Sequence, residues 1–205
     1  MSEGKKPVAA PQRQKAQLTR EALLRAAREK FTVDGYVGSS LDAIVKHAGV
    51  TKGALFHHFK DKADLFLQVM LGLEQEMNMT ANKAAVEIGR ANMPDNPFAG
   101  FIAGCGVYFD YSARQDYRRI VMMDGAAVIG EFEWRRIDSE LGMKTINSGL
   151  QFLYDQKAIR TPPTPALTVM IQGAVNGAGF AIARGDQSIH KEDLLARIET
   201  TLRLL

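Results

Sequence analysis

The sequence predicts an all-helical protein, for three reasons. Apolar residues recur at the three- and four-residue spacing of amphipathic helices over most of the 205 residues. Runs typical of β-strands are scarce, and helix-capping residues such as Thr51 and the pair Thr164-Pro165 precede periodic segments. We therefore expect nine or ten helices, with a short-helix module of three at the front.

The first expected helix follows an arm. Residues 1–17 contain two prolines and lack apolar periodicity, which predicts a mobile basic arm. Thr19 can cap a helix near 19–34, on which apolar side chains form one stripe, and Gly35 supplies its end.

Two short helices come next. Ser39 or Ser40 can cap the segment 41–47, Gly49 lies just past its end, and Thr51 can cap the segment 52–59. A long helix then opens on Asp61 and Asp64 and extends to about Arg90. Further helices are expected near 97–113, 116–123, 126–137, 139–158, 165–184 and 189–205.

Composition excludes several classes of protein. With 18 glycines, 7 prolines and 46% hydrophobic residues, the chain is neither collagen-like nor wholly disordered. Cys105 is the single cysteine, so it forms no internal disulfide, and a reducing cytosolic compartment is expected. No signal-peptide run is visible. The apolar stretch Ala166–Ala183 is interrupted by Gln172 and Asn176, which favours a buried helix over a membrane span.

The charge is distributed unevenly. Residues 1–60 contain 11 Lys and Arg against 5 Asp and Glu, whereas residues 61–205 contain 15 against 18. A basic segment followed by a mildly acidic remainder indicates that the first part meets a polyanion.

The two short helices have the form of a helix-turn-helix. Gly49 permits a left-handed turn, and Ile44, Val45, Val50 and Leu55 can pack the pair together. The second helix of such a unit enters the DNA major groove with its N-terminal residues at the base edges. Helical hairpins with a glycine turn also occur in proteins that never touch DNA, so the basic charge is what favours the DNA-binding interpretation.

The chain also resembles a known family at these residues. The segments that carry the likeness are TREALLRAA from Thr19, Gly35-Tyr36, and AGVTKGALFHHFKDK from Ala48 to Lys62. Residues 18–70 resemble the DNA-binding domain of the tetracycline-repressor (TetR) family, and residues 124–138 are similar to a segment of one subgroup. The resemblance implies a DNA-binding domain at 18–60 and a ligand-binding and dimerisation domain at 61–205.

The resemblance also implies roles for individual residues. Lys52 and Gly53 match positions that reach base edges. Phe56 stands where the family usually has Tyr, which leaves it an apolar contact. Positions that meet phosphates are matched by Ser40, Thr51, His57, His58 and Lys62. Neighbouring Leu55 and Phe59 are expected in the core. No metal site is expected at the two histidines, because adjacent residues on a helix point about 100° apart.

Methionines and aromatic residues of the second domain indicate an adaptable apolar pocket, although such residues also simply fill cores. The pocket residues we expect are Met70, Met77, Phe101, Tyr108, Tyr117, Met122 and Trp134. Small residues on one side of the helix 165–184 let another helix approach closely, in a second subunit or within the same one. The resemblance favours a homodimer interface formed by Thr145, Phe152, Gly173, Gly177 and Ala181.

The leading hypothesis is a cytoplasmic, nucleoid-associated transcription regulator, acting as a repressor. It binds a palindromic double-stranded DNA operator as a homodimer, and a small apolar or aromatic effector releases it; no cofactor and no membrane are involved. One alternative is a helical DNA-coating or partner-binding protein without a specific operator. Another is an enzyme, but Cys105 stands between two glycines in an apolar run, and neither a P-loop nor Gly-x-Ser-x-Gly occurs.

Overall fold

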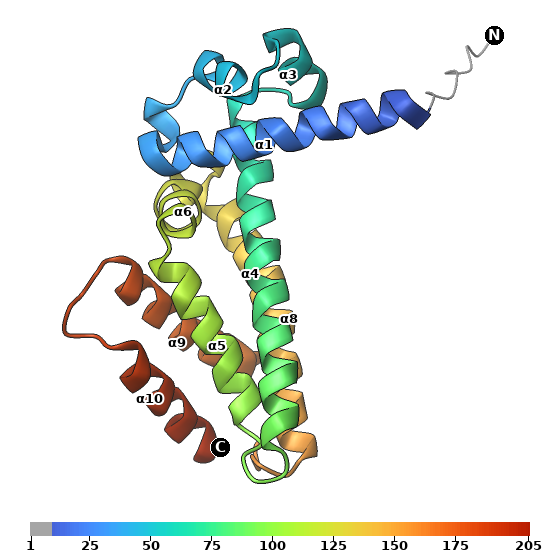
Figure 1. Cartoon of the computed structure of the whole chain (residues 1–205). Coiled ribbons are helices and arrows are strands. Elements are labelled where there is room, and N and C mark those ends of the chain that lie inside the picture. The colour runs from blue at the N-terminus through green and yellow to red at the C-terminus, as the bar shows by residue number, and fades with distance from the viewer. Residues whose placement is uncertain (1–9) are drawn as a thin grey trace. The chain divides into compact units, whose positions relative to one another are not determined.

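The computed structural model describes residues 10–205, and over this range it is built of helices joined by turns, without a β-strand (Figure 1). The prediction of an all-helical fold is confirmed. The helices are α1 (Ala10–Gly38), α2 (Leu41–Ala48), α3 (Lys52–His58), α4 (Lys62–Asn92), α5 (Ala99–Ala113), α6 (Gln115–Tyr117), the π-helical segment η1 (Arg118–Asp124), α7 (Gly125–Ile129), α8 (Glu131–Asp155), α9 (Pro165–Ala183) and α10 (Lys191–Arg203).

The chain divides into two compact units. The first extends to Val69 and the second runs from Met70 to Leu205, so the boundary falls within α4. Each unit has its own core: the first is built of α1 to α3 with the start of α4, and the second of the remaining helices.

Helix α1 begins earlier than the sequence predicts, because the chain is already helical at Ala10. Thr19 is not a cap: its hydroxyl donates to the Lys15 carbonyl at 3.0 Å, a bond that continues a helix. The part of the expected arm at residues 1–9 lies outside the described residues. The predicted break at Gly35 is confirmed, since this residue has φ 69° and ψ 176°.

The helix-turn-helix forms as the capping residues predict. The Ser40 hydroxyl accepts the Ala43 N–H at 3.1 Å, and the Thr51 hydroxyl accepts the Ala54 N–H at 3.2 Å. Gly49 ends α2 in the left-handed region, with φ 67°. Ile44, Leu55 and Phe59 are buried, together with Phe31 and Phe66, whose rings are 5.2 Å apart. Burial confirms the core roles expected for Leu55 and Phe59.

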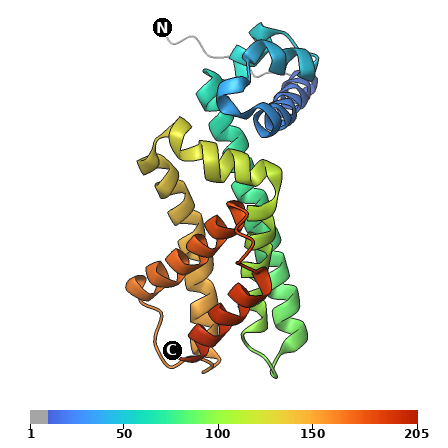
Figure 2. The same cartoon turned by 90° about the vertical axis from the view of Figure 1, so that its left-hand side faces the viewer.

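The second unit is organised around α9. This helix packs against α5 and α8, while α10 packs against α5, and Figure 2 shows the two C-terminal helices on the face toward the viewer. The core between them includes Phe109, Leu150, Leu153 and Leu202. This packing positions α5 and α8 beside the second half of α4.

Helix boundaries in the middle of the second unit differ from the prediction. The expected break near residue 138 is wrong, because α8 runs unbroken from Glu131 and the break lies at Gly130, with φ 87°. Residues 118–124 form a π-helix rather than an ordinary one. A side chain of α8 occupies a backbone acceptor within this π-helix, because the Trp134 indole N–H donates to the Val121 carbonyl at 2.8 Å.

By length and composition, α9 is apolar enough to cross a membrane. One side of it lies in the core of the second unit, where Leu167, Ile171 and Val175 are buried. The other side is apolar and exposed, with Val169 54% and Met170 71% accessible. The helix therefore packs as the sequence predicts on one side and leaves the other side open.

Candidate DNA interface and ligand cavity

Helix α3 presents an exposed face formed by residues predicted to contact DNA. Thr51, Lys52, Gly53, Phe56 and His57 are all exposed, whereas Leu55 and Phe59 face the core. Phe56 is 51% accessible, an unusual exposure for a phenylalanine on an otherwise polar face. The structure therefore brings five of the eight predicted contact residues together on one surface.

The first residue of α3 is held by an ion pair that the sequence did not reveal. The Lys52 Nζ lies 2.9 Å from Asp42 Oδ1 and 3.1 Å from Oδ2, and both side chains are largely exposed. An exposed pair of this kind contributes about 0–1 kcal/mol. Its effect is on position: it keeps the ammonium group beside α2 at the start of the exposed face of α3.

The remaining predicted contacts flank α3. Ser40 caps α2. His58 is half-buried, and this burial is the main reason why the pKa of its imidazole is lowered; the neighbouring His57 and Arg20 lower it further. The Lys62 Nζ lies 4.3 Å from the centre of the Tyr36 ring, and desolvation lowers the pKa of this amine. His57 and His58 have ring centres 5.2 Å apart. Among residues 10–205, no cluster of three or more His, Cys, Asp or Glu is arranged to hold a metal.

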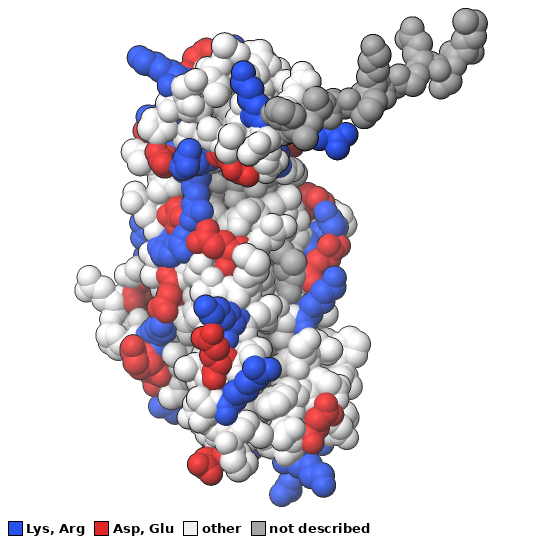
Figure 3. Space-filling model, turned by 45° about the vertical axis from the view of Figure 1, so that its right-hand side comes forward, with Lys and Arg blue, Asp and Glu red and all other residues white. Residues whose placement is uncertain are grey.

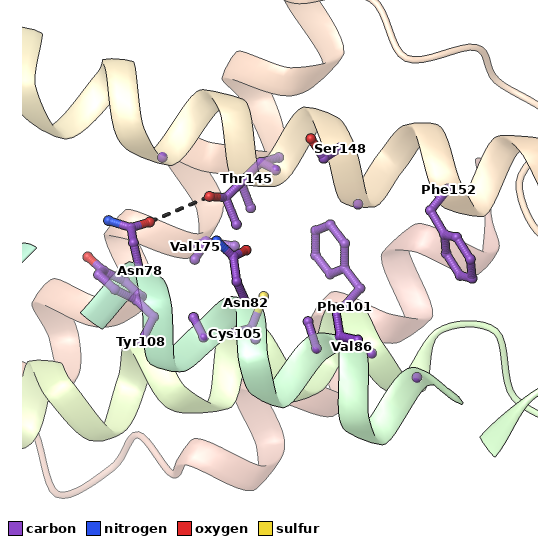
Figure 4. Close-up of a pocket in the computed structure, with 18 of the residues that line it drawn as sticks. Asn78, Asn82, Val86, Phe101, Cys105, Tyr108, Thr145, Ser148, Phe152 and Val175 are labelled. Atoms are coloured by element: carbon purple, nitrogen blue, oxygen red, sulfur yellow. Dashed lines mark hydrogen bonds between the residues drawn. The ribbon is translucent and has the colours of Figure 1, made fainter. Parts of the chain in front are cut away.

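A cavity of about 590 Å³ lies in the second unit, between α4, α5, α8 and α9 (Figure 4). Its volume is typical of small-molecule sites. Along one edge α4 and α5 meet backbone to backbone: a Cβ on Gly100 would lie 2.6 Å from the Ala85 carbonyl oxygen and 3.1 Å from the Gly89 Cα. Side chains form the rest of the wall.

Three of the predicted pocket residues, Met77, Phe101 and Tyr108, line this cavity. The other four do not. Met70 is buried in the core, and Tyr117 is buried with its hydroxyl donating to Glu74 at 3.1 Å. Met122 lies in the π-helical segment, and Trp134 packs on Phe180, with ring centres 5.9 Å apart. Met70 and Tyr117 thus fill the core, which is the alternative that the sequence left open.

The cavity contains polar residues that sequence reasoning missed. Asn78 and Asn82 project from α4, Thr145 and Ser148 from α8, and Gln172 and Asn176 from α9. Asn78 and Asn82 stand four residues apart on one helical face, a spacing that is visible in the sequence. No local signal shows that this face meets polar residues of two later helices.

Cys105 also lines the cavity, and burial raises the pKa of its thiol to about 12. At pH 8 only about one thiol in ten thousand is then ionised, and the thiolate is the reactive form. We expect an aromatic disulfide reagent to leave Cys105 unmodified in the folded protein and to label one thiol per chain in denaturant. Rapid labelling of the folded chain would show that the thiol is accessible.

The predicted interface residues are divided between two surroundings. Gly173 and Gly177 are exposed, and a Cβ on either would have open space around it. Thr145 instead lines the cavity, Ala181 is buried, and Phe152 lines the cavity while 43% accessible. The exposed side of α9 thus consists of Val169, Met170 and small residues.

Charge on the second unit is balanced within helices. On α8, Arg136 pairs with Glu133 and Glu140. On the face drawn in Figure 3, Lys and Arg are interspersed with Asp and Glu rather than gathered by sign. Pairs of this kind are typical of a solvated helix surface.

Curated relatives match the first unit. AcrR of Shigella flexneri, an HTH-type transcriptional regulator, is 47% identical over 57 residues, which are 28% of this chain and 26% of AcrR. BepR of Brucella suis, an HTH-type transcriptional repressor, is 46% identical over 52 residues, 25% of each protein. The chain thus spans about a quarter of the length of these curated relatives.

Solved structures match nearly the whole chain. The crystal structure of a TetR-family transcriptional regulator from Pectobacterium atrosepticum is 27% identical, covers 94% of both chains and gives a TM-score of 0.71. A SmeT–triclosan complex, 18% identical, covers 89% of this chain and 90% of its own with a TM-score of 0.68, and shows the same fold.

Family models cover both units. The model for bacterial regulatory proteins of the tetR family matches residues 23–69, and the model for tetracyclin repressor-like C-terminal domains matches residues 98–205, more than half of the chain. With a capped helix-turn-helix in the first unit and this C-terminal domain in the second, the chain belongs to the TetR family of transcriptional regulators.

Proposed function

We propose that the protein is a ligand-responsive repressor that binds a palindromic DNA operator as a homodimer and releases it when a small molecule fills the cavity. The observation that carries this proposal is the pairing, in one TetR-family chain, of an exposed recognition helix with a separate cavity of about 590 Å³. The domains we assign remain 18–60 for DNA binding and 61–205 for ligand binding and dimerisation. Such a repressor acts in the cytoplasm, at the nucleoid.

At the DNA, α3 lies in the major groove in this proposal. Lys52 and Gly53 read base edges, because lysine donates to guanine acceptors and glycine lets the backbone come close. Thr51, Ser40, His57, His58 and Lys62 contact phosphates, and Phe56 makes an apolar contact. The basic balance of the first 60 residues supports this assignment.

The exposed apolar side of α9 supports the homodimer. A two-fold dimer presents two recognition helices to the two halves of a palindrome. Gly173 and Gly177 leave room for a facing helix, and burying Val169 and Met170 removes their apolar surface from water. Exposed apolar surfaces of this kind are typical of contacts with another protein chain.

Footprinting tests the function. Purified protein is incubated with the DNA upstream of its own coding region, and the protected region is mapped. We expect a bounded footprint over an inverted repeat, with half-sites about one helical turn apart. Uniform protection of any DNA would instead favour a coating protein without an operator.

Release by the ligand is proposed to act through α4, which contributes Lys62 to the first unit and Met77 to the cavity. A ligand shifts the protein only by as much as it prefers one conformation over another. Ion pairs join the middle of α4 to the segment after α5: Arg114 lies 3.0 Å from Glu76 of α4 and 2.9 Å from Asp116. In this proposal, movement of the cavity wall is transmitted along α4 to the first unit.

Met77→Trp is expected to lower effector affinity at least about tenfold, because Met77 is buried against the cavity and the larger ring occupies ligand space. Candidate effectors are first screened for release of operator DNA, and a hit is then titrated against both variants. Met79→Trp is the matched control, since Met79 lies on the same helix, is 69% accessible and does not line the cavity. Unchanged effector affinity and release in Met77→Trp would move the effector site elsewhere.

A further inference from the structure

The cavity has a polar end and an apolar end. On α4, Glu74, Asn78 and Asn82 are followed along the chain by Val86, Gly89 and the exposed Arg90, and Met93 lies just past the end of the helix. On α8, Thr145 and Ser148 are followed by Gly149 and Phe152. Figure 4 shows Asn78, Tyr108 and Thr145 at one end of the cavity and Phe152 at the other. Apart from Arg90, the lining residues of the two helices change from polar to apolar in the same direction.

The other two walls agree with this gradient. On α5, which runs the opposite way, Tyr108 lies at the polar end and Phe101 at the apolar end (Figure 4). From α9 come two carboxamides, Gln172 and Asn176, and Gln172 lies beside Gly142, which precedes Thr145 on α8. The Thr145 hydroxyl donates to Asn78 Oδ1 at 3.5 Å. Polar groups from four helices thus converge at one end.

Helix geometry gives the cavity a length. The eight residues from Asn78 to Val86 rise about 12 Å along α4, and the further four to Arg90 about 6 Å more, at 1.5 Å per residue. An occupant that uses both ends is therefore long compared with a single aromatic ring, with its polar part beside Asn78 and Asn82.

The polar groups favour an uncharged head. Carboxamides and hydroxyls both donate and accept hydrogen bonds, so they match a group that does the same. Among the described lining residues the ionisable side chains near the polar end are those of Glu74, which already accepts the Tyr117 hydroxyl, and Tyr108; Arg90 is exposed and sixteen residues from Glu74 along α4. An anionic head would meet the Glu74 carboxyl, and an ammonium head accepts no hydrogen bond, so it cannot match the N–H groups of the carboxamides. Burying an unpaired charge is costly.

We propose that the cavity binds an uncharged amphipathic molecule, with an amide- or hydroxyl-type head among Asn78, Asn82, Gln172 and Asn176 and an extended apolar tail between Val86, Phe101 and Phe152. This ligand class rests on the proposed effector site and specifies its chemistry.

The test uses three probes that each have a chain of ten carbons: decanamide and decanoate, whose tenth carbon belongs to the head group, and decyltrimethylammonium. Each is titrated into the DNA-free protein by calorimetry, so the result does not depend on operator binding. We expect decanamide to bind at least tenfold tighter than either ion. Shortening the amide from ten carbons to eight should weaken binding about fourfold per methylene.

Two variants test the orientation. Asn82→Leu is expected to reduce the preference for the amide over the ions to less than threefold, whereas Val86→Asn should weaken all three probes alike. Asn92→Leu is the control, because Asn92 is exposed on the same helix and outside the cavity lining, with its amide donating to the Ile88 carbonyl at 2.8 Å. It should behave as the wild type.

Tighter binding of either ion, no binding of any probe, or an amide preference that survives Asn82→Leu would overturn the proposed ligand class. If the protein protects an operator and is released by a compound unrelated to these probes, the repressor function stands while the ligand class fails. If the amide binds as expected but no operator is found, the ligand class stands while the repressor function fails.

Discussion

Lys52→Ala is expected to weaken binding to the specific operator by about 2–6 kcal/mol, because a base contact is worth about 1–3 kcal/mol and a homodimer makes it twice. The ion pair adds to the loss. Without the ammonium group, the Asp42 carboxylate that lay 2.9 Å from it is left unpaired on the surface that we propose meets phosphates. Dissociation constants are measured on the footprinted operator and on random DNA over a range of salt concentrations.

Two further variants distinguish recognition of base edges from electrostatic attraction to phosphates. Lys62→Ala, the control, should weaken operator and random DNA alike and reduce the salt slope by about one for each phosphate that the lysine no longer neutralises. The double variant Asp42→Ala/Lys52→Ala should recover part of the affinity that Lys52→Ala loses. Equal loss on both kinds of DNA for Lys52→Ala would remove this lysine from the base-reading residues.

Gly177→Leu is expected to separate the proposed dimer and to lower operator affinity by about 10²-fold or more, since two linked half-sites bind far more tightly than one. Leucine has a better helix propensity than glycine, and space is open around this position in a single subunit. Unfolding therefore does not explain the loss. Sedimentation velocity gives the oligomeric state, and the same samples are titrated with operator DNA.

Gly72→Leu is the matched control for this experiment, because Gly72 is also a helical, exposed glycine with open space around its Cβ position, but on α4. It should leave sedimentation and operator binding unchanged. If Gly177→Leu sediments as the wild type does, the exposed side of α9 is not the dimer contact.

The features that were predictable from the sequence are those set by neighbouring residues. Caps at Ser40 and Thr51 and the left-handed turn at Gly49 depend on a few consecutive positions, and all three form as expected. Burial of Leu55 and Phe59 follows from helical periodicity. The start of α1 was missed because residues 10–17 lack an apolar stripe, yet side-chain bonds such as that from Gln17 to Glu21 extend the helix.

Features that depend on distant residues were not predictable. Asp42 and Lys52 are ten residues apart and meet only because the turn folds α2 and α3 together. Thr145 was predicted at the dimer interface because a small polar residue on a helix has the same pattern whether it faces a partner or a cavity. Only the arrangement of α4, α5, α8 and α9 distinguishes the two.

The backbone contact between Gly100 on α5 and Ala85 and Gly89 on α4 has a consequence for cross-reactivity. These three residues carry no side chain larger than a methyl group, so this edge fixes one dimension of any occupant. The facing wall, with Phe152 on α8, adapts by side-chain rotation. Among congeners of equal volume, we therefore expect a sharp cutoff for branches that point toward Gly100 and graded tolerance for branches that point toward Phe152.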